Sequence, residues 1–108
     1  MKPTDWIVLK FGGTSVSRRN RWNTIGALMR KRLEDENVRV LVVVSALSGV
    51  TNTLQSIIDQ HADKTAVQSL VDTLLEKHRL FCKELDISAD TVLADRFTAL
   101  QALVHDAR

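Results

Sequence analysis

Several residue types that mark special classes of protein are scarce in this sequence. Its 108 residues include one cysteine, one proline, four glycines and no tyrosine. The lone Cys82 excludes a disulfide framework and a multi-cysteine metal site, and it is typical of a reduced, cytoplasmic chain. The single proline, Pro3, and the few glycines leave no flexible linker, and no repeat or low-complexity segment is present. The length is that of one domain.

Charge and hydropathy argue against two classes of partner. Lys and Arg number 15 and Asp and Glu 13, so the formal net charge is only +2, and both signs are scattered along the chain. This pattern argues against nucleic acid as the main partner. The longest apolar run, residues 40–44, is far shorter than the ~20 residues of a membrane helix, and residues 6–9 are too few for a signal-peptide core. The three histidines stand far apart in no metal-ligand spacing, so no metal site is expected.

The hydrophobic pattern predicts an α/β fold. Residues 6–10 form a short β-branched and aromatic run that stops at Gly12 and Gly13, which indicates a buried strand entering a tight turn. Residues 38–46 give the strongest strand signal, and the core of this segment is apolar on both faces, as in a central strand of a parallel sheet covered by helices. Between these strands, apolar residues at helical spacing predict a helix from about 20 to 33. A strand, a helix and a strand in this order form a βαβ unit.

The second half of the sequence predicts only helices. The first begins near Thr51 and places Leu54, Ile57, Ile58 and His61 on one face. A second is expected over residues 66–85, and a third follows Ser88, a plausible N-cap. Two strands are too few for a stable parallel sheet, so we expect this chain to be the N-terminal piece of a larger domain.

The loop after the first strand has the composition of an anion site. Ligands of α/β sheets bind outside the carboxyl ends of the strands. Gly12 and Gly13 let the backbone approach an anion, Thr14 and Ser15 add hydroxyl donors, and Lys10 adds an ammonium group. Phosphate suits this set best, although neither of the common Gly-rich phosphate motifs is present. On these features alone, a glycine turn with a solvated lysine explains the pattern equally well.

The loop after the second strand, residues 45–52 (SALSGVTN), has a similar character. Small and hydroxylated residues link a buried strand to a helix, whose first N–H groups can bind a carboxylate or phosphate. The alternative is that Ser48, Thr51 or Asn52 caps this helix, and we expect one of them to do so. Two such loops at adjacent strand ends are more informative than either alone.

Residues 10–16 (KFGGTSV) and residues 43–52 (VVSALSGVTN) together resemble the start of an aspartate kinase, a member of the amino acid kinase superfamily. The resemblance covers residues 6–60 by motif and the later helices by pattern. It implies a three-layer α/β/α sandwich, incomplete in this chain. It also implies phosphorylation of the β-carboxylate of L-aspartate by Mg-ATP to give 4-phospho-L-aspartate, the entry to lysine, threonine, methionine and diaminopimelate. The segments 6–10 and 17–22 resemble most the aspartate kinases fused to a diaminopimelate decarboxylase.

The resemblance also implies residue roles. It assigns Lys10 to the transferring phosphoryl group as the catalytic residue. It further assigns the ATP phosphates to Lys10, Gly12, Gly13, Thr14 and Ser15, and aspartate to Ser45 and Thr51. Mg²⁺ arrives with ATP, because no protein ligand for it is identifiable here. The family's remaining substrate residues, adenine pocket and regulatory ACT domains lie beyond residue 108, so the isolated chain is expected to be inactive. The intact protein is expected to be a homo-oligomer. Another amino acid kinase and a non-catalytic anion-binding module stay open as alternatives.

Overall fold

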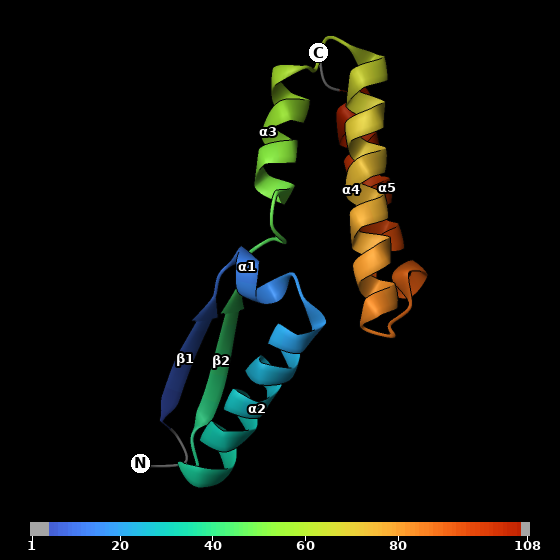
Figure 1. The fold of residues 1–108 in the computed structure, drawn as a ribbon. Helices are drawn as coiled ribbons and strands as arrows, with labels where there is room; N and C mark the ends of the chain where they lie inside the picture. Colours follow the sequence, from blue (N-terminus) through green and yellow to red (C-terminus); the bar gives the residue numbers. More distant parts are fainter. Residues whose placement is uncertain (1–4, 107–108) are drawn as a thin grey trace. The chain divides into compact units, whose positions relative to one another are not determined.

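The computed structural model describes residues 5–106, so Pro3 lies outside the described residues. The elements follow the order β1 (Trp6–Phe11), α1 (Gly13–Val16), α2 (Arg19–Asp35), β2 (Arg39–Val44), α3 (Val50–Asp59), α4 (Lys64–Glu84) and α5 (Ala89–Asp106) (Figure 1). The predicted α/β class, with parallel strands and helices, is confirmed. The chain divides into two compact units, the first ending at Ser48 and the second beginning at Gly49.

The first unit is the expected βαβ arrangement. Strands β1 and β2 are parallel, in a register that runs from Trp6 opposite Arg39 to Phe11 opposite Val44. The N–H of Ser45 donates to the carbonyl oxygen of Phe11 at 3.2 Å, which extends the ladder past the last strand pair. Both strands therefore end side by side, and Figure 1 shows both arrows pointing to the same end of the sheet. The loops that follow them leave from this common edge.

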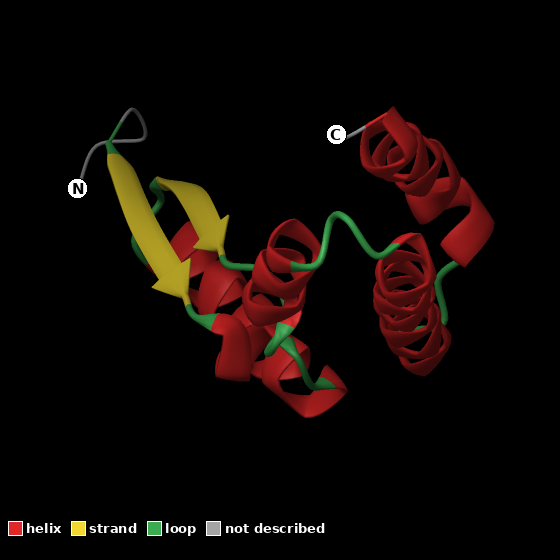
Figure 2. Ribbon diagram, turned by 90° about the horizontal axis from the view of Figure 1, so that it is seen from above, coloured by secondary structure: helices red, strands yellow, loops and turns green. Residues whose placement is uncertain are grey.

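Helix α2 connects the two strands and packs against β2 (Figure 2). Its Ile25 is only 2% exposed, and it is the largest fully buried side chain of the described residues. The helix ends at Asp35, and Asn37, with φ 50°, takes the left-handed conformation that asparagine tolerates better than most residues. Val38, buried directly afterwards, anchors the start of β2.

The sheet is less covered than the sequence predicts. Alternate residues of β1 are half-buried and exposed, and the exposed set includes Trp6 and Val8. On β2, Leu41 and Val43 are likewise exposed. The expectations of a buried first strand and of a second strand covered by helices on both faces are therefore wrong for the described residues, because both strands have exposed side chains on one face.

The second unit contains the three predicted helices. Val67, Val71 and Leu74 of α4 are buried in its core. Asp63 caps α4 by accepting a hydrogen bond from the N–H of Ala66 at 3.0 Å. The predicted N-cap of the last helix is confirmed, since the N–H of Thr91 donates to the Ser88 hydroxyl at 3.4 Å.

One expected helical residue is not in a helix. The prediction placed His61 on the face of the helix that begins near Thr51, but α3 ends at Asp59. His61 lies in the following turn, where its Nδ1 is 3.0 Å from the carbonyl oxygen of Ile58. Among the described residues, no helix is long and apolar enough to cross a membrane.

Candidate functional site

The candidate site lies at the edge of the sheet where β1 and β2 end. We call residues 12–17 the first loop and residues 45–49 the second loop. Both start next to one another because Phe11 and Val44, the last residues of the two strands, are paired. The first motif and the part of the second motif up to Ser48 are thereby brought to one place within the first unit.

The first loop is more regular than the predicted tight turn. Gly12 is extended, with φ −80° and ψ 178°, and its carbonyl oxygen accepts hydrogen bonds from the N–H groups of Ser15 and Val16 at 3.1 and 3.2 Å. These bonds wind residues 13–16 into the single helical turn α1. Val16 is only 1% exposed, and its carbonyl oxygen accepts a hydrogen bond from the indole Nε1 of Trp22 at 2.7 Å. The loop is thus fixed to the body of the unit at its far end.

The two glycines of the first loop have different surroundings. A Cβ atom placed on Gly12 would meet no heavy atom within 4 Å, so the space beside this residue is open. A Cβ on Gly13 would lie 3.1 Å from the carbonyl oxygen of Ala46 and 3.4 Å from the hydroxyl oxygen of Ser45. Gly13 therefore lets the first loop approach the second, whereas Gly12 leaves room for a ligand.

The remaining predicted phosphate-facing residues lie on or next to the first loop. Lys10 is exposed in β1, opposite Val43. Thr14 is exposed in α1, and Ser15 is half-buried there. An ammonium group, two hydroxyl groups and open space beside a glycine are thus gathered at one end of β1.

The predicted aspartate-facing residues are divided between the two units. Ser45 is exposed in the second loop, and its hydroxyl donates to the carbonyl oxygen of Ala46 at 2.8 Å. Thr51 belongs to the second unit and is exposed in the first turn of α3. Among the described residues, no group forms a hydrogen bond with the Thr51 hydroxyl.

The start of α3 corrects one prediction. None of Ser48, Thr51 and Asn52 caps this helix with its side chain. The N-cap is Gly49, which has φ 82° and ψ −11° and whose carbonyl oxygen accepts from the N–H of Thr53 at 3.0 Å. Glycine adopts this left-handed conformation without the steric cost that a Cβ atom brings.

Ser17 is a residue of this site that the sequence did not single out. Its hydroxyl donates to the carbonyl oxygen of Gly13 and lies 3.3 Å from the hydroxyl of Ser48. Its oxygen accepts a hydrogen bond from the N–H of Ser48 at 2.8 Å. The spacing of four residues between Gly13 and Ser17 could have predicted the hydrogen bond between them. The hydrogen bond from Ser48, 31 residues later, could not be predicted from the sequence.

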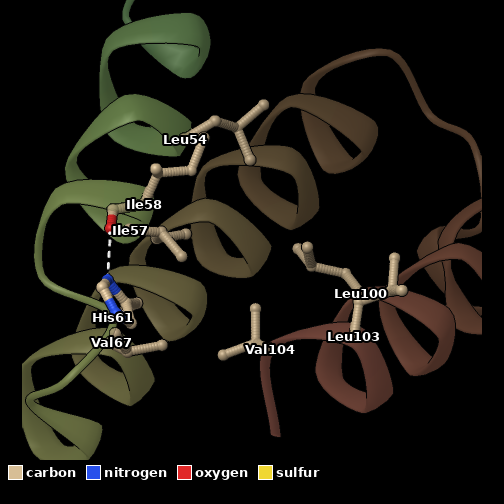
Figure 3. Close-up of a pocket in the computed structure, with 8 residues that line it drawn as sticks. All are labelled: Leu54, Ile57, Ile58, His61, Val67, Leu100, Leu103 and Val104. Atoms are coloured by element: carbon tan, nitrogen blue, oxygen red, sulfur yellow. Dashed lines mark hydrogen bonds between the residues drawn. The ribbon is translucent and has the colours of Figure 1, made fainter. Parts of the chain in front are cut away.

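The site does not coincide with an apolar pocket of the second unit. That pocket, of about 620 Å³, is formed by side chains of α3, α4 and α5 and the turn after α3 (Figure 3). Its lining residues are Leu54, Ile57, Ile58, His61, Val67, Leu100, Leu103 and Val104. None of them is a predicted site residue, and none is a lysine or arginine that could bind phosphate.

Comparison with known proteins identifies the family. Residues 5–105 match the model of the amino acid kinase family. The chain belongs to the amino acid kinase family. The match extends through the helices of the second unit, beyond the two motifs from which the sequence resemblance was drawn.

Individual relatives of this amino acid kinase chain carry more specific names. It is 34% identical over 102 residues to a chloroplastic bifunctional aspartokinase/homoserine dehydrogenase of Daucus carota, an alignment that covers 94% of this chain and 10% of the relative. It is 36% identical over 81 residues to a similar bifunctional protein of Arabidopsis thaliana, covering 74% and 8%. An aspartokinase of Rickettsia felis is 41% identical over 54 residues, covering 50% and 13%. The chain thus spans about a tenth of the length of these relatives, and no solved structure matches it significantly.

Proposed function

We propose that this chain is the N-terminal part of the catalytic domain of an aspartate kinase. The intact protein phosphorylates the β-carboxylate of L-aspartate with ATP and forms 4-phospho-L-aspartate. The observation that carries the proposal is the meeting of the two loops at one sheet edge, with open space beside Gly12, in a chain of the amino acid kinase family. The names of the relatives favour aspartate over other acceptors.

The first loop suits the phosphate groups of ATP. Its open space beside Gly12 would accept a phosphate oxygen, and Lys10, Thr14 and Ser15 add a cation and two hydroxyl groups around it. Bound ATP supplies the phosphoryl group, and Mg²⁺ enters with it. Within the part of the chain that the structure describes, no group of three or more His, Cys, Asp or Glu could hold a metal ion.

Lys10 is the proposed catalytic residue. Phosphoryl transfer depends mainly on positioning and on positive charge placed where negative charge develops. The Lys10 ammonium is an exposed cation at the end of β1, two residues before the open space at Gly12. In our proposal it neutralises the oxygens of the transferring group.

Ser45 and Thr51 are the proposed aspartate contacts. The Ser45 hydroxyl donates to Ala46, so its oxygen keeps lone pairs that can accept a hydrogen bond from the substrate amine. Thr51 carries a hydroxyl in the first turn of α3. Such a hydroxyl can donate to a substrate carboxylate.

The proposal extends to the pathway, the compartment and the assembly of the intact protein. We assign the reaction to the biosynthesis of lysine, threonine, methionine and diaminopimelate, in a reduced compartment such as the cytoplasm, by a homo-oligomeric protein without nucleic-acid or membrane partners. Fusion to a diaminopimelate decarboxylase stays a prediction, and the plant relatives are named as fusions to homoserine dehydrogenase.

The decisive experiment uses the full-length polypeptide that carries this chain. Acyl phosphate formation, trapped with hydroxylamine, should require ATP and L-aspartate, and L-glutamate, N-acetyl-L-glutamate and carbamate should be poor acceptors. Preference for one of those three acceptors would assign the chain to another amino acid kinase. Nucleotide binding without turnover of any acceptor would indicate a non-catalytic binding module.

A further inference from the structure

We infer that Ser17 is a positioning residue of the proposed kinase site, and this inference rests on the proposed function. Its hydroxyl group ties the first loop to the second. The phosphate-facing residues belong to the end of β1 and the first loop, and Ser45 belongs to the second loop, so Ser17 holds the two halves of the site in register.

The hydrogen bonds of Ser17 run to both loops at once. Its hydroxyl donates to the carbonyl oxygen of Gly13, within the first loop. Its oxygen accepts from the backbone N–H of Ser48 at 2.8 Å, within the second loop. One oxygen atom thus joins backbone groups that are separated by more than 30 residues, and each bond restrains main chain rather than a mobile side chain.

The surroundings of Ser17 hold it in place. It is half-buried and follows Val16, which is 1% exposed and bonded through its carbonyl oxygen to the Trp22 indole. The loops also run close to one another, because a Cβ atom on Gly13 would lie only 3.1 Å from the carbonyl oxygen of Ala46. The hydroxyl of Ser17 therefore acts between two backbone segments that are already near neighbours.

The chemistry explains why this link matters. In phosphoryl transfer the protein contributes mainly geometry and charge, and a misplacement of the reacting groups by about 1 Å, caused by a mutation far from them, can cost about 10²-fold in rate. Without the Ser17 hydroxyl, the Ser48 N–H loses its acceptor and the second loop can move relative to Lys10 and Gly12. The expected loss is in kcat, since the ATP-facing groups all stay on β1 and the first loop, which follow one another in the chain.

The test compares three variants of the full-length protein. Ser17→Ala removes the link, Ser17→Thr keeps the hydroxyl, and Ser56→Ala is the control. The Ser56 hydroxyl is half-buried and donates only to the carbonyl oxygen of Asn52, one turn earlier in α3. We expect Ser17→Ala to lower kcat for aspartate phosphorylation by at least about tenfold with a smaller change in the KM for ATP. Ser17→Thr should recover most of kcat, and Ser56→Ala should match the wild type.

A second measurement uses the same full-length variants. Amide hydrogen exchange at Ser48 should become several-fold faster in Ser17→Ala and stay unchanged in Ser56→Ala. Unchanged exchange at Ser48 would overturn the inference, and so would a Ser17→Ala enzyme that melts earlier but keeps its kcat. If the wild-type protein forms no aspartyl phosphate, the proposed function fails, and faster Ser48 exchange in Ser17→Ala still supports the link between the loops.

Discussion

A Cβ atom on Gly13 would lie 3.1 Å from the carbonyl oxygen of Ala46, closer than ordinary van der Waals contact. Because this neighbour is backbone, it cannot move aside as the end of a flexible side chain would. The glycine at position 13 is therefore required by the contact between two loops, and the glycine before it is not. The two adjacent glycines look equivalent in the sequence, but only Gly13 is needed for the contact between the loops.

The first prediction compares Gly13→Ala with Gly12→Ala. Gly13→Ala should destabilise the chain by about 1–3 kcal/mol, the usual cost of overpacking. Gly12→Ala should change the stability by less than about 0.5 kcal/mol, because the added methyl group meets no atom within 4 Å and the φ of −80° is allowed. In the full-length enzyme it should instead raise the KM for ATP. Chemical denaturation and steady-state kinetics check both halves, and an equal loss of stability in the two variants would contradict the assignment.

The second prediction concerns Lys10 in the full-length enzyme. Lys10→Ala should lower kcat by roughly 10²-fold or more, as for other lost transition-state electrostatics, with a smaller effect on ATP binding. Because Lys10 is exposed, the melting temperature should change little. Lys31→Ala, which removes an exposed lysine of α2, is the matched control. A Lys10→Ala enzyme with near-normal kcat would remove this residue from the catalytic role.

The third prediction concerns Thr51. Thr51→Val keeps the shape of the side chain and removes the hydroxyl, so the KM for aspartate should rise by an amount equivalent to about 1–3 kcal/mol. Stability should be nearly unchanged, because Gly49 and not Thr51 is the N-cap of α3. Thr53→Val is the control: its hydroxyl donates to the carbonyl oxygen of Gly49 at 2.9 Å, so its loss affects only the helix start. An unchanged KM in Thr51→Val, measured together with thermal melts, would argue against the aspartate contact.

Local structure could be predicted from the sequence because its signals are local. The run of β-branched residues at 40–44 and the helical spacing from Trp22 onward are visible without knowledge of the fold, and both strands and α2 lie where expected. The parallel pairing followed from the βαβ order. It in turn places Lys10 and Ser45 at one edge, so most of the candidate site could be predicted as well.

The features that were missed depend on contacts between distant segments or on backbone conformation. The bond between Ser17 and Ser48 joins two ends of a βαβ unit, and neither serine shows its partner in the sequence. The cap of α3 was assigned to a side chain, but the left-handed φ of Gly49 starts the helix without one. Val8 and Leu41 were expected to be buried because they are apolar, but they are exposed on the outer face of the sheet. A sequence pattern cannot show whether another element is present to cover that face.

The fourth prediction follows from the conformation of Gly49. Gly49→Ala should destabilise the 108-residue chain by about 1–2 kcal/mol, because a residue with a Cβ atom is strained at a φ of 82°. The Nζ atom of Lys77, 3.4 Å from the added methyl group, is the end of a flexible side chain and should add little to this cost. Gly49→Asn should be less damaging, since asparagine tolerates this region. Equal melting temperatures for wild type and Gly49→Ala would contradict the assigned backbone conformation.

The last prediction concerns the 108-residue chain in isolation. Its sheet has two strands in the described residues, and unpaired strand edges recruit other chains. The outer face of the sheet adds exposed apolar side chains, with Trp6 57%, Val8 59% and Leu41 50% exposed. We therefore expect the chain to self-associate at roughly tens of micromolar. As a separate outcome, we expect the isolated chain to form no detectable aspartyl phosphate.

Sedimentation velocity and the hydroxylamine assay test the two parts of this prediction separately. Leu41→Lys places a charge on the outer face opposite Val8 and should shift the population toward monomer, whereas the control Leu80→Lys, at an exposed position of α4 in the second unit, should not. A compact wild-type monomer at these concentrations would show that the open face and edges do not drive association. Aspartyl phosphate formed by the purified chain would show that residues 1–108 already contain a working site.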